Sequence, residues 1–428
     1  MLLVATAFVV FLLLGMPVAF AIGISGTLFF FLHPELPFTI PVQVTVSQTQ
    51  NFALLAIPLF IVAGNVMNKS GITEQLLSLA SVLTGRLRGG LAQVSLALAT
   101  LMGGVCGSAI ADAAMQTRML GHGMMQRGLS RGFAAGILSF GSLITPIIPP
   151  GIGFIIYGTI GQVSIGRLFA AGIVPGLLIW LALGIAVWIA AMQRGYEPER
   201  STRPSIGEVV SSLRAGVWAI LFPVFLLFGL RLGVFTPSEI GAFAVIYALV
   251  IGLLVYRELK QRSFVEALEG SVTDVGAVMF LIAVSAIFSY GVVLERVPET
   301  ISGWILGLTN NLNAVMLLIA AFIMVAGFFI DATVLVIMLT PIFLPLVREL
   351  DGDPVHFGLI FIVACTIGNF TPPVGAAMYA VCSILKCPIG EYTRESIPFF
   401  IAAIVVLAVL IFAPDLVLYV PDLIFGPS

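Results

Sequence analysis

The chain has 428 residues, of which 60% are hydrophobic and only 9% are charged. Soluble domains carry about 25% charged residues, so this composition predicts a polytopic membrane protein. The net charge of -2 and the lack of a GxxxxGKS loop argue against nucleic acid as a partner and against nucleotide chemistry.

Apolar segments follow one another along almost the whole chain. A transmembrane helix needs roughly 20 apolar residues. The segments that approach this length are 2–15, 17–33, 52–68, 129–160, 168–192, 215–232, 238–256, 272–294, 355–385 and 396–420. Gly or polar residues interrupt two further stretches, 76–126 and 303–346, which we expect to form re-entrant hairpins. The expected fold is therefore all-α, with about ten or eleven transmembrane helices.

A short amphipathic segment precedes the third span of each half. The two segments are FTIPVQVTVSQTQ, residues 38–50, and SFVEALEGSVTD, residues 263–274. Each could lie in the membrane plane and brace a fixed scaffold. Each could equally form an ordinary loop, and both interpretations stay open.

The second half of the chain is predicted to repeat the first. Pro149-Pro150 corresponds to Pro372-Pro373, and an aspartate, Asp112 or Asp331, precedes each pair at a similar distance. A proline pair inside an apolar segment predicts a broken helix, with the breaks at 141–151 and 368–375. The chain therefore carries two matched breaks.

The longest polar run, residues 193–214, is predicted to be a linker between a first repeat, 1–192, and a second repeat, 215–428. Five spans in each half would make the two repeats inverted. With a cytoplasmic linker, most of the 19 Lys and Arg residues fall on the cytoplasmic side, as the positive-inside rule requires, and both termini are periplasmic. Inverted repeats with paired breaks indicate a secondary transporter whose site lies near the membrane midplane.

The two breaks predict exposed backbone groups that bind ions. Non-helical backbone inside a membrane must be buried in protein or line a cavity. Freed carbonyls can coordinate a hard cation such as sodium, while the next half-helix directs its N-terminus at an anion. The candidates are Gly141, Ile144, Thr145 and Pro146 at the first break, and Gly368, Asn369 and Phe370 at the second. A simple proline kink is the alternative.

The hairpin stretches supply polar side chains. GGVCGSAIADAA, residues 103–114, contains Ser108 and Asp112, and AGFFIDATVLVIMLTP, residues 326–341, contains Asp331 and Thr333. A carboxylate at the bilayer centre costs about 2.5 to 3.5 kcal/mol on insertion scales, so it usually faces a cavity or an ion. Either aspartate could instead only cap a helix.

Other classes of protein also have to be weighed. Paired intramembrane aspartates occur in intramembrane aspartyl proteases, but the YD, GxGD and PAL motifs of that class do not occur here. A channel is a further alternative, and neither class requires inverted, paired breaks. The His and Cys residues lack the spacing of metal ligands, and no organic cofactor is expected.

Several ordered blocks of sequence are similar to a known family. The chain resembles, over essentially its whole length, the large membrane subunit of tripartite ATP-independent periplasmic (TRAP) transporters of the DctM or SiaM type. The blocks are LLAIPLFIVAGNVMNKSGI (54–72), LTGRLRGGLA (83–92), GSAIADAA (107–114), PIIPPGIGFIIYG (146–158), FTPSEIGAFAVIYAL (235–249), LTPIFLPL (339–346), DPVHFGLIF (353–361) and IGNFTPPVGAAMY (367–379).

The resemblance implies a transporter of the bacterial or archaeal cytoplasmic membrane rather than an enzyme. It implies an elevator-type fold and sodium-driven uptake of a small organic anion, such as a C4-dicarboxylate, another carboxylate or a sialic acid. The implied partners are a soluble periplasmic binding protein and a small four-helix membrane subunit, expected here as a separate chain. A stand-alone sodium/dicarboxylate symporter of related fold is the alternative.

The resemblance also implies where ions bind. Two or more sodium ions would lie between each hairpin tip and the facing break, and the substrate carboxylate would lie close by. For sodium this implicates Cys106, Ser108, Asp112, Gly141, Ile144 and Pro146 in the first repeat, and Gly327, Asp331, Thr333, Gly368 and Phe370 in the second. For the substrate it implicates Ser108, Thr145, Asn369 and Thr371. A thiol is a poor sodium ligand, so Cys106 would act through its backbone carbonyl.

Overall fold

The computed structural model describes residues 1–427, and every regular element in that range is helical. The predicted all-α fold is therefore confirmed. Six helices are long and apolar enough to cross a membrane, or seven if one bent pair counts as a single span. The predicted spans 2–15 and 17–33 are single shorter helices, and the predicted spans 129–160 and 355–385 are each divided in two at the proline pairs.

The first half runs from α1 to α11. Its elements are α1 (Leu2–Leu13), α2 (Val18–Leu32), α3 (Ile40–Thr49), the 3-10 turn η1 (Phe52–Leu55), α4 (Ala56–Asn68), α5 (Ile72–Thr84), α6 (Leu91–Met102), α7 (Ala109–Gln126), α8 (Arg131–Gly141), α9 (Ile152–Gly161), α10 (Ile165–Ala171) and α11 (Ile173–Arg194).

The second half begins after the linker and follows the same order of elements. It contains α12 (Ile206–Arg231), α13 (Pro237–Val250), the π-helical turn η2 (Ile251–Val255), α14 (Gln261–Leu294), α15 (Val297–Leu306), α16 (Leu312–Gly327), α17 (Ala332–Glu349), α18 (Pro354–Asn369), α19 (Ala376–Leu385), α20 (Ile389–Phe412) and α21 (Pro414–Phe425). Each half thus has two helices, an arm that leads into a further helix, a short helix, a hairpin and a broken helix. The first half then ends with α10 and α11, which together make one span, and the second with the span α20 followed by α21.

Polar side chains define where several of these helices begin. The Ser130 hydroxyl accepts a hydrogen bond from the Phe133 N–H at the start of α8. Thr236 and Glu239 form a reciprocal capping box at α13. The Asp353 carboxylate accepts from two backbone N–H groups at α18. Such caps satisfy donors that the first helical turn leaves free.

The two amphipathic segments are both helical, so their interpretation as ordinary loops is wrong. In the first half, α3 meets α4 at a bend of 55°. In the second half, the segment 263–274 is the beginning of α14, a single helix of 34 residues. It was expected to be separate from the span that follows it, but the sequence there contains no Pro, and its one glycine, Gly270, does not break the helix.

The two hairpins are shorter than the stretches assigned to them from the sequence. Helices α6 and α7 form the first hairpin, and α16 and α17 form the second. Helix α5 is separated from the first hairpin by a turn in which Gly89 and Gly90 have φ of +99° and +47°. Such positive φ values favour glycine. Helix α15 is likewise separate from the second hairpin.

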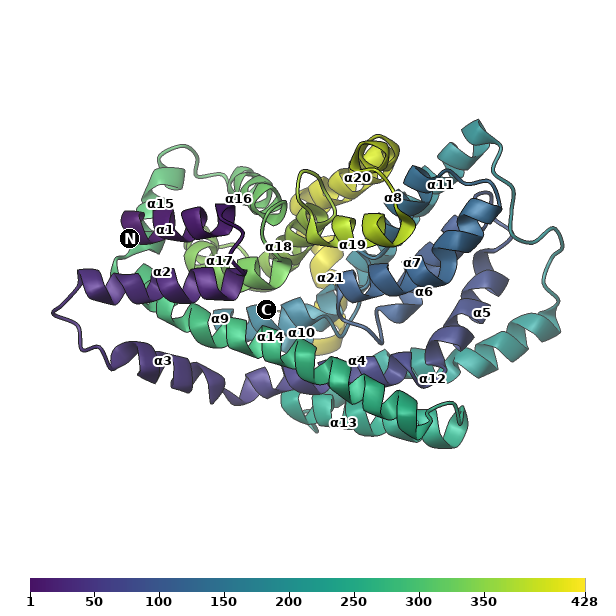
Figure 1. The fold of residues 1–428 in the computed structure, drawn as a ribbon, viewed down its shortest axis with the longest axis horizontal. Helices are drawn as coiled ribbons and strands as arrows, with labels where there is room; N and C mark the ends of the chain where they lie inside the picture. Colours follow the sequence, from purple (N-terminus) through teal and green to yellow (C-terminus); the bar gives the residue numbers. More distant parts are fainter. Residues whose placement is uncertain (428) are drawn as a thin grey trace.

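Two groups of helices surround the breaks. We use "frame" for α1 to α4 with α12 to α14, because α14 packs on α2, α3 and α4, and α13 packs on α4. We use "core group" for the hairpins and broken helices, where the halves interlock: α7 packs on α19, α8 on α20 and α9 on α17. In Figure 1, α14 crosses below α17 and α18 and runs alongside α4.

Both breaks lie inside the core group. The first separates α8 from α9 over residues 142–151, and the second separates α18 from α19 over residues 370–375. The peptide bonds Pro149-Pro150 and Pro372-Pro373 are both cis. The two breaks therefore have the same local form in the two halves.

Candidate functional site

A cavity of about 450 Å³ lies where the core group meets the frame. Its walls come from both hairpin tips, both broken helices, and helices α4 and α14 of the frame. The polar residues that line it are Asn65, Cys106, Ser108, Asp274, Asp331, Thr333, Thr366 and Asn369. This is the place where the residues predicted from the sequence come together.

At the first hairpin tip, Asp112 connects the hairpin to the first break. Its Oδ2 accepts hydrogen bonds from the Thr145 hydroxyl at 2.7 Å and from the Gln116 amide at 2.8 Å. The side chain is fully buried, and its Oδ1 has no donor within the described part of the chain. Ser108, rather than Asp112, caps α7 by accepting from the Ala111 N–H at 3.4 Å.

At the second hairpin tip, Asp331 has two roles. Its Oδ1 caps α17 by accepting from the Thr333 N–H at 2.8 Å. Its Oδ2 accepts from the Asn369 amide at 3.3 Å, which connects the hairpin to the second break. The Oδ1 of Asn369 is buried and has no donor among residues 1–427. The capping interpretation therefore holds for Asp331 but does not describe its whole environment.

Glycines let each hairpin tip approach the facing break. A Cβ on Gly107 would lie 2.5 Å from the carbonyl oxygen of Pro150. A Cβ on Gly368 would lie 2.6 Å from the carbonyl oxygen of Met324 and 2.7 Å from the Cα of Gly327. Only glycine fits at such contacts, since real Cβ atoms do not approach backbone atoms so closely.

Backbone groups add a further link at the second break. The Gly375 N–H donates to the Phe328 carbonyl at the hairpin tip over 2.8 Å. The Phe370 carbonyl accepts from the Tyr392 hydroxyl at 2.7 Å. A carbonyl oxygen has two lone pairs, so this bond leaves Phe370 one acceptor position.

The residues expected to bind substrate fall into two groups. Ser108 and Asn369 line the cavity. Thr145 is fully buried behind the cavity wall, where it donates to Asp112, and Thr371 donates to the Ile367 carbonyl at 2.7 Å.

The residues expected to bind sodium divide in the same way. Several line the cavity directly: Cys106, Ser108, Pro146, Asp331 and Thr333. The others lie behind it at the junctions between tip and break: Asp112, Gly141, Ile144, Gly327, Gly368 and Phe370.

Two orphaned oxygens make these junctions suitable for a hard cation. Asp112 Oδ1 and Asn369 Oδ1 are buried oxygens without a donor, one at each junction. Buried polar atoms normally have a partner, so these two oxygens are free to accept a ligand. Carboxylate and amide oxygens are ligands that hard cations prefer.

The electrostatics of the cavity are unusual for an anion site. Lys, Arg and His are absent from its lining over residues 1–427, while Asp274 and Asp331 contribute carboxylates. Three helices begin at its wall, through Ala109 of α7, Ile152 of α9 and Ala332 of α17. Each helix N-terminus carries roughly half a positive charge. Asp331 occupies the start of α17 and Asp112 lies in the first turn of α7, whereas the first turn of α9 contains no acidic residue.

The frame side of the cavity was not predicted from the sequence. Asn65 of α4 and Asp274 of α14 both line it. The Asn65 amide donates to Asp274 Oδ2 at 3.2 Å and to the Ser271 hydroxyl at 3.1 Å. The polar residues at the end of the segment 263–274 were the available signal, but they could be interpreted only once α14 was known to be continuous.

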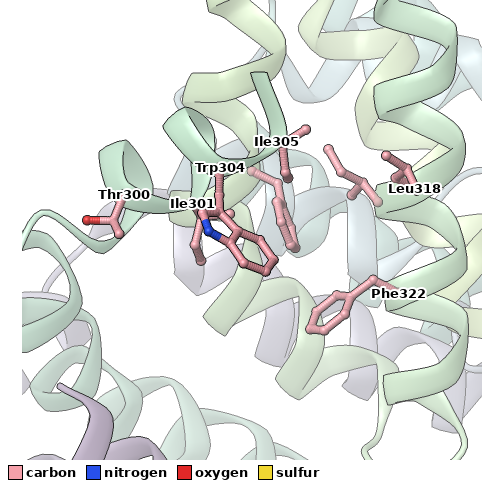
Figure 2. Close-up of a pocket in the computed structure, with 8 residues that line it drawn as sticks. Thr300, Ile301, Trp304, Ile305, Leu318 and Phe322 are labelled. Atoms are coloured by element: carbon pink, nitrogen blue, oxygen red, sulfur yellow. The ribbon is translucent and has the colours of Figure 1, made fainter. Parts of the chain in front are cut away.

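A second hollow, between α15 and α16, has a different character. Figure 2 shows Ile301 and Trp304 facing Leu318 and Phe322 across it. Among the eight side chains that line it, only the Thr300 hydroxyl and the Trp304 indole N–H are polar. A hollow with so few polar groups cannot fix the orientation of an anion.

Fold comparison finds solved structures with the same architecture. The structure is similar to the Alcanivorax borkumensis YdaH transporter, with a TM-score of 0.65, covering 90% of this chain and 89% of that one at 16% sequence identity. At that identity the likeness concerns the fold, which is that of a membrane transporter of unusual topology.

Sequence comparison identifies the family. Residues 5–416 match the family model of the tripartite ATP-independent periplasmic transporter, DctM component. The chain is 33% identical to the 2,3-diketo-L-gulonate TRAP transporter large permease protein YiaN of Escherichia coli, covering 95% of both chains. It is also 33% identical to the sialic acid TRAP transporter large permease protein SiaM of Vibrio cholerae, covering 96% of both. The chain therefore belongs to the DctM family, whose members are transporter permeases and not enzymes.

One relative is longer than this chain. The isethionate TRAP transporter permease protein DctMQ of Oleidesulfovibrio alaskensis is 32% identical over 96% of this chain, but the match covers only 65% of that protein. Large and small permease components thus occur both apart and joined in the family.

Proposed function

We propose that this chain is the large membrane subunit of a TRAP transporter that couples uptake of a small organic anion to sodium entry. The observation that carries the proposal is the pair of matched junctions between tip and break. Each holds a buried oxygen without a donor, Asp112 Oδ1 or Asn369 Oδ1, beside one shared cavity. Two junctions support at least two sodium ions.

The anion would bind between the two hairpin tips. The N-termini of α7 and α9 face the cavity, and Ser108 and Asn369 line it. Backbone N–H groups at helix N-termini bind anions without a basic side chain. The substrate carboxylate would therefore lie near Ser108, on the side of the first hairpin.

Sodium would supply the positive charge that the lining of the cavity lacks. The cavity contains the carboxylates of Asp274 and Asp331, and Asp112 lies close behind its wall. An organic anion that enters such a region is repelled unless cations enter with it. This requirement couples the two ligands, because each one improves the binding of the other.

We further propose an elevator-type movement of the core group against the frame. The proposal rests on the position of the cavity at the boundary between the two groups, with α4 and α14 as its frame wall. Movement of the core group would carry both hairpin tips and both breaks together, since hydrogen bonds join each tip to its own break, and α7 packs on α19 and α9 on α17.

The proposed partners are a soluble periplasmic binding protein, a small membrane subunit and membrane lipid. Family membership supports the first two, because the family model describes a tripartite transporter. The relatives' names support an organic acid as substrate, since they include 2,3-diketo-L-gulonate and sialic acid. Family membership also favours this system over a stand-alone symporter.

Reconstitution tests the proposal. The complete transporter, in proteoliposomes, is supplied with binding protein loaded with an organic acid and with an inward gradient of either sodium or potassium. Accumulation with sodium and not with potassium is expected. Equal accumulation with the two cations would contradict sodium coupling, and accumulation without the binding protein would favour the stand-alone symporter.

A further inference from the structure

The first hairpin tip rests directly on the frame. A Cβ on Gly104, in the tip, would lie 2.4 Å from the Cγ of Pro223 in α12, and the rigid proline ring cannot turn away from it. A Cβ on Gly64, in α4, would lie 3.1 Å from the Val105 carbonyl oxygen. The tip therefore packs between α4 and α12 at a distance that only glycine allows. We call this contact the first seat.

The other two glycines of this tip make contacts of a different kind. A Cβ on Gly103 would lie 2.5 Å from the Cβ of Ile148, and one on Gly107 would lie equally close to the Pro150 carbonyl oxygen. Both neighbours belong to the first break, which moves together with the tip. The contact of Gly104 with α12 instead joins two groups of helices that the proposed movement separates.

The second hairpin tip is held apart from the corresponding part of the frame. Although α17 packs on α14, an apolar cavity of about 640 Å³ lies between this tip, α1 and the end of α14. Ala326 and Ile330 line it from the tip, Phe288 and Val292 line it from α14, and Val9 lines it from α1. In Figure 1, α1 lies beside α16 and α17.

The two places are equivalent under the inverted repeat. Because both halves have the same order of elements, α1 corresponds to α12, the end of α14 to α4, and the second hairpin to the first. The first tip packs between α4 and α12, and the cavity lies between α14 and α1. One place is therefore filled by a hairpin tip, while its counterpart is open.

We propose that this cavity is a second seat, which the second hairpin tip enters when the first tip leaves the first seat. The inference rests on the proposed function, which moves the core group against the frame. Packing lost at one tip is regained at the other, so the two end states stay close in free energy, as a two-state transporter requires. Gly64 and Gly104 are thus positioning residues that hold the state seen in the structure.

Filling the second seat tests the inference. Val9 lines the cavity, whereas its neighbour Val10 is similarly exposed and does not line it. Val9→Trp should abolish uptake in proteoliposomes that have an inward sodium gradient and loaded binding protein. It should still be stabilised by sodium over potassium in melting curves in detergent, because the first seat and both junctions are untouched. Val10→Trp is the matched control and should retain both properties.

Normal uptake by Val9→Trp would overturn the inference and leave the cavity to membrane lipid. Normal uptake by the wild type together with this result would leave the proposed function standing. If the wild type shows no sodium-dependent uptake, both are overturned.

A disulfide tests whether the first tip must leave its seat. A Cβ at position 64 would lie 3.9 Å from the Cα of the native Cys106, so Gly64→Cys is within reach of a disulfide with it. Oxidation with copper phenanthroline in detergent, before reconstitution, should link the tip to α4 and abolish uptake, and reduction should restore it. In the control Gly64→Cys/Cys106→Ser, oxidation should not change the uptake rate. Absence of the disulfide, or undiminished uptake by the linked protein, would contradict the inference.

Discussion

The Thr145 hydroxyl donates a hydrogen bond of 2.7 Å to the fully buried carboxylate of Asp112, and so joins the first break to the first hairpin. Asn369 and Asp331 form the corresponding pair in the second half, at 3.3 Å. The repeat thus preserves the junction between hairpin and break although the side chains that form it differ.

Removing the charge of Asp112 should weaken sodium binding. Asp112→Asn keeps the shape of the side chain but replaces a charged ligand, so the sodium concentration for half-maximal uptake should rise about tenfold or more. The measurement is a sodium titration of uptake in proteoliposomes. Asp415→Asn, an exposed position in α21, is the control and should match the wild type. An unchanged titration for Asp112→Asn would remove this residue from the cation site.

Substitutions of Asp331 should distinguish its role as a helix cap from the effect of its negative charge on uptake. Asn caps helices as well as Asp does, whereas Ala loses about 1 kcal/mol at such a position. Asp331→Ala should therefore lower both the melting temperature and the uptake rate, and Asp331→Asn should lower uptake while the melting temperature stays close to wild type. Melting curves and uptake rates are compared on the same preparations. Wild-type uptake by both variants would show that Asp331 serves only as a cap.

Gly368 should tolerate no side chain. A Cβ there would lie 2.6 Å from the Met324 carbonyl, so Gly368→Ala must push α18 away from α16. Uptake should fall to background levels even where the protein still reaches the membrane, as judged by immunoblot. Gly390→Ala is the control, because a Cβ there meets no atom of the described chain within 4 Å. Normal uptake by Gly368→Ala would mean that the close packing is not needed.

The predicted orientation can be tested by cysteine labelling. All four native cysteines are buried, so background labelling with an impermeant maleimide should be low. Ser201→Cys in the linker should react only after cells are permeabilised, and Pro427→Cys should react in intact spheroplasts. Both positions are exposed. The opposite pattern would invert the proposed topology.

The main features of the core group could be predicted from the sequence because their signals are local. Proline pairs predict broken helices wherever they occur in an apolar segment, and Asp112 and Asp331 stand out against an apolar background. The hydrogen-bond partners of these two aspartates were harder to predict. Thr145 lies 33 residues from Asp112, and Asn369 lies 38 residues from Asp331, so only the folded chain pairs them.

The frame was harder to predict for a physical reason. The segment 263–274 is polar and the residues after it are apolar, so composition suggested two elements where α14 is one helix. Asp274 sits at that change in polarity and therefore resembled the end of a surface arm. Its position in the cavity depends on the packing of α14 against α4, which no local pattern encodes.

Simultaneous measurement of sodium and organic-acid influx tests the central claim most directly. In proteoliposomes that contain the complete transporter, radioactive sodium should enter only when loaded binding protein is present, with at least two sodium ions for each anion. Asp112→Asn should reduce both fluxes together. Accumulation of the organic acid without accompanying sodium entry would contradict the account.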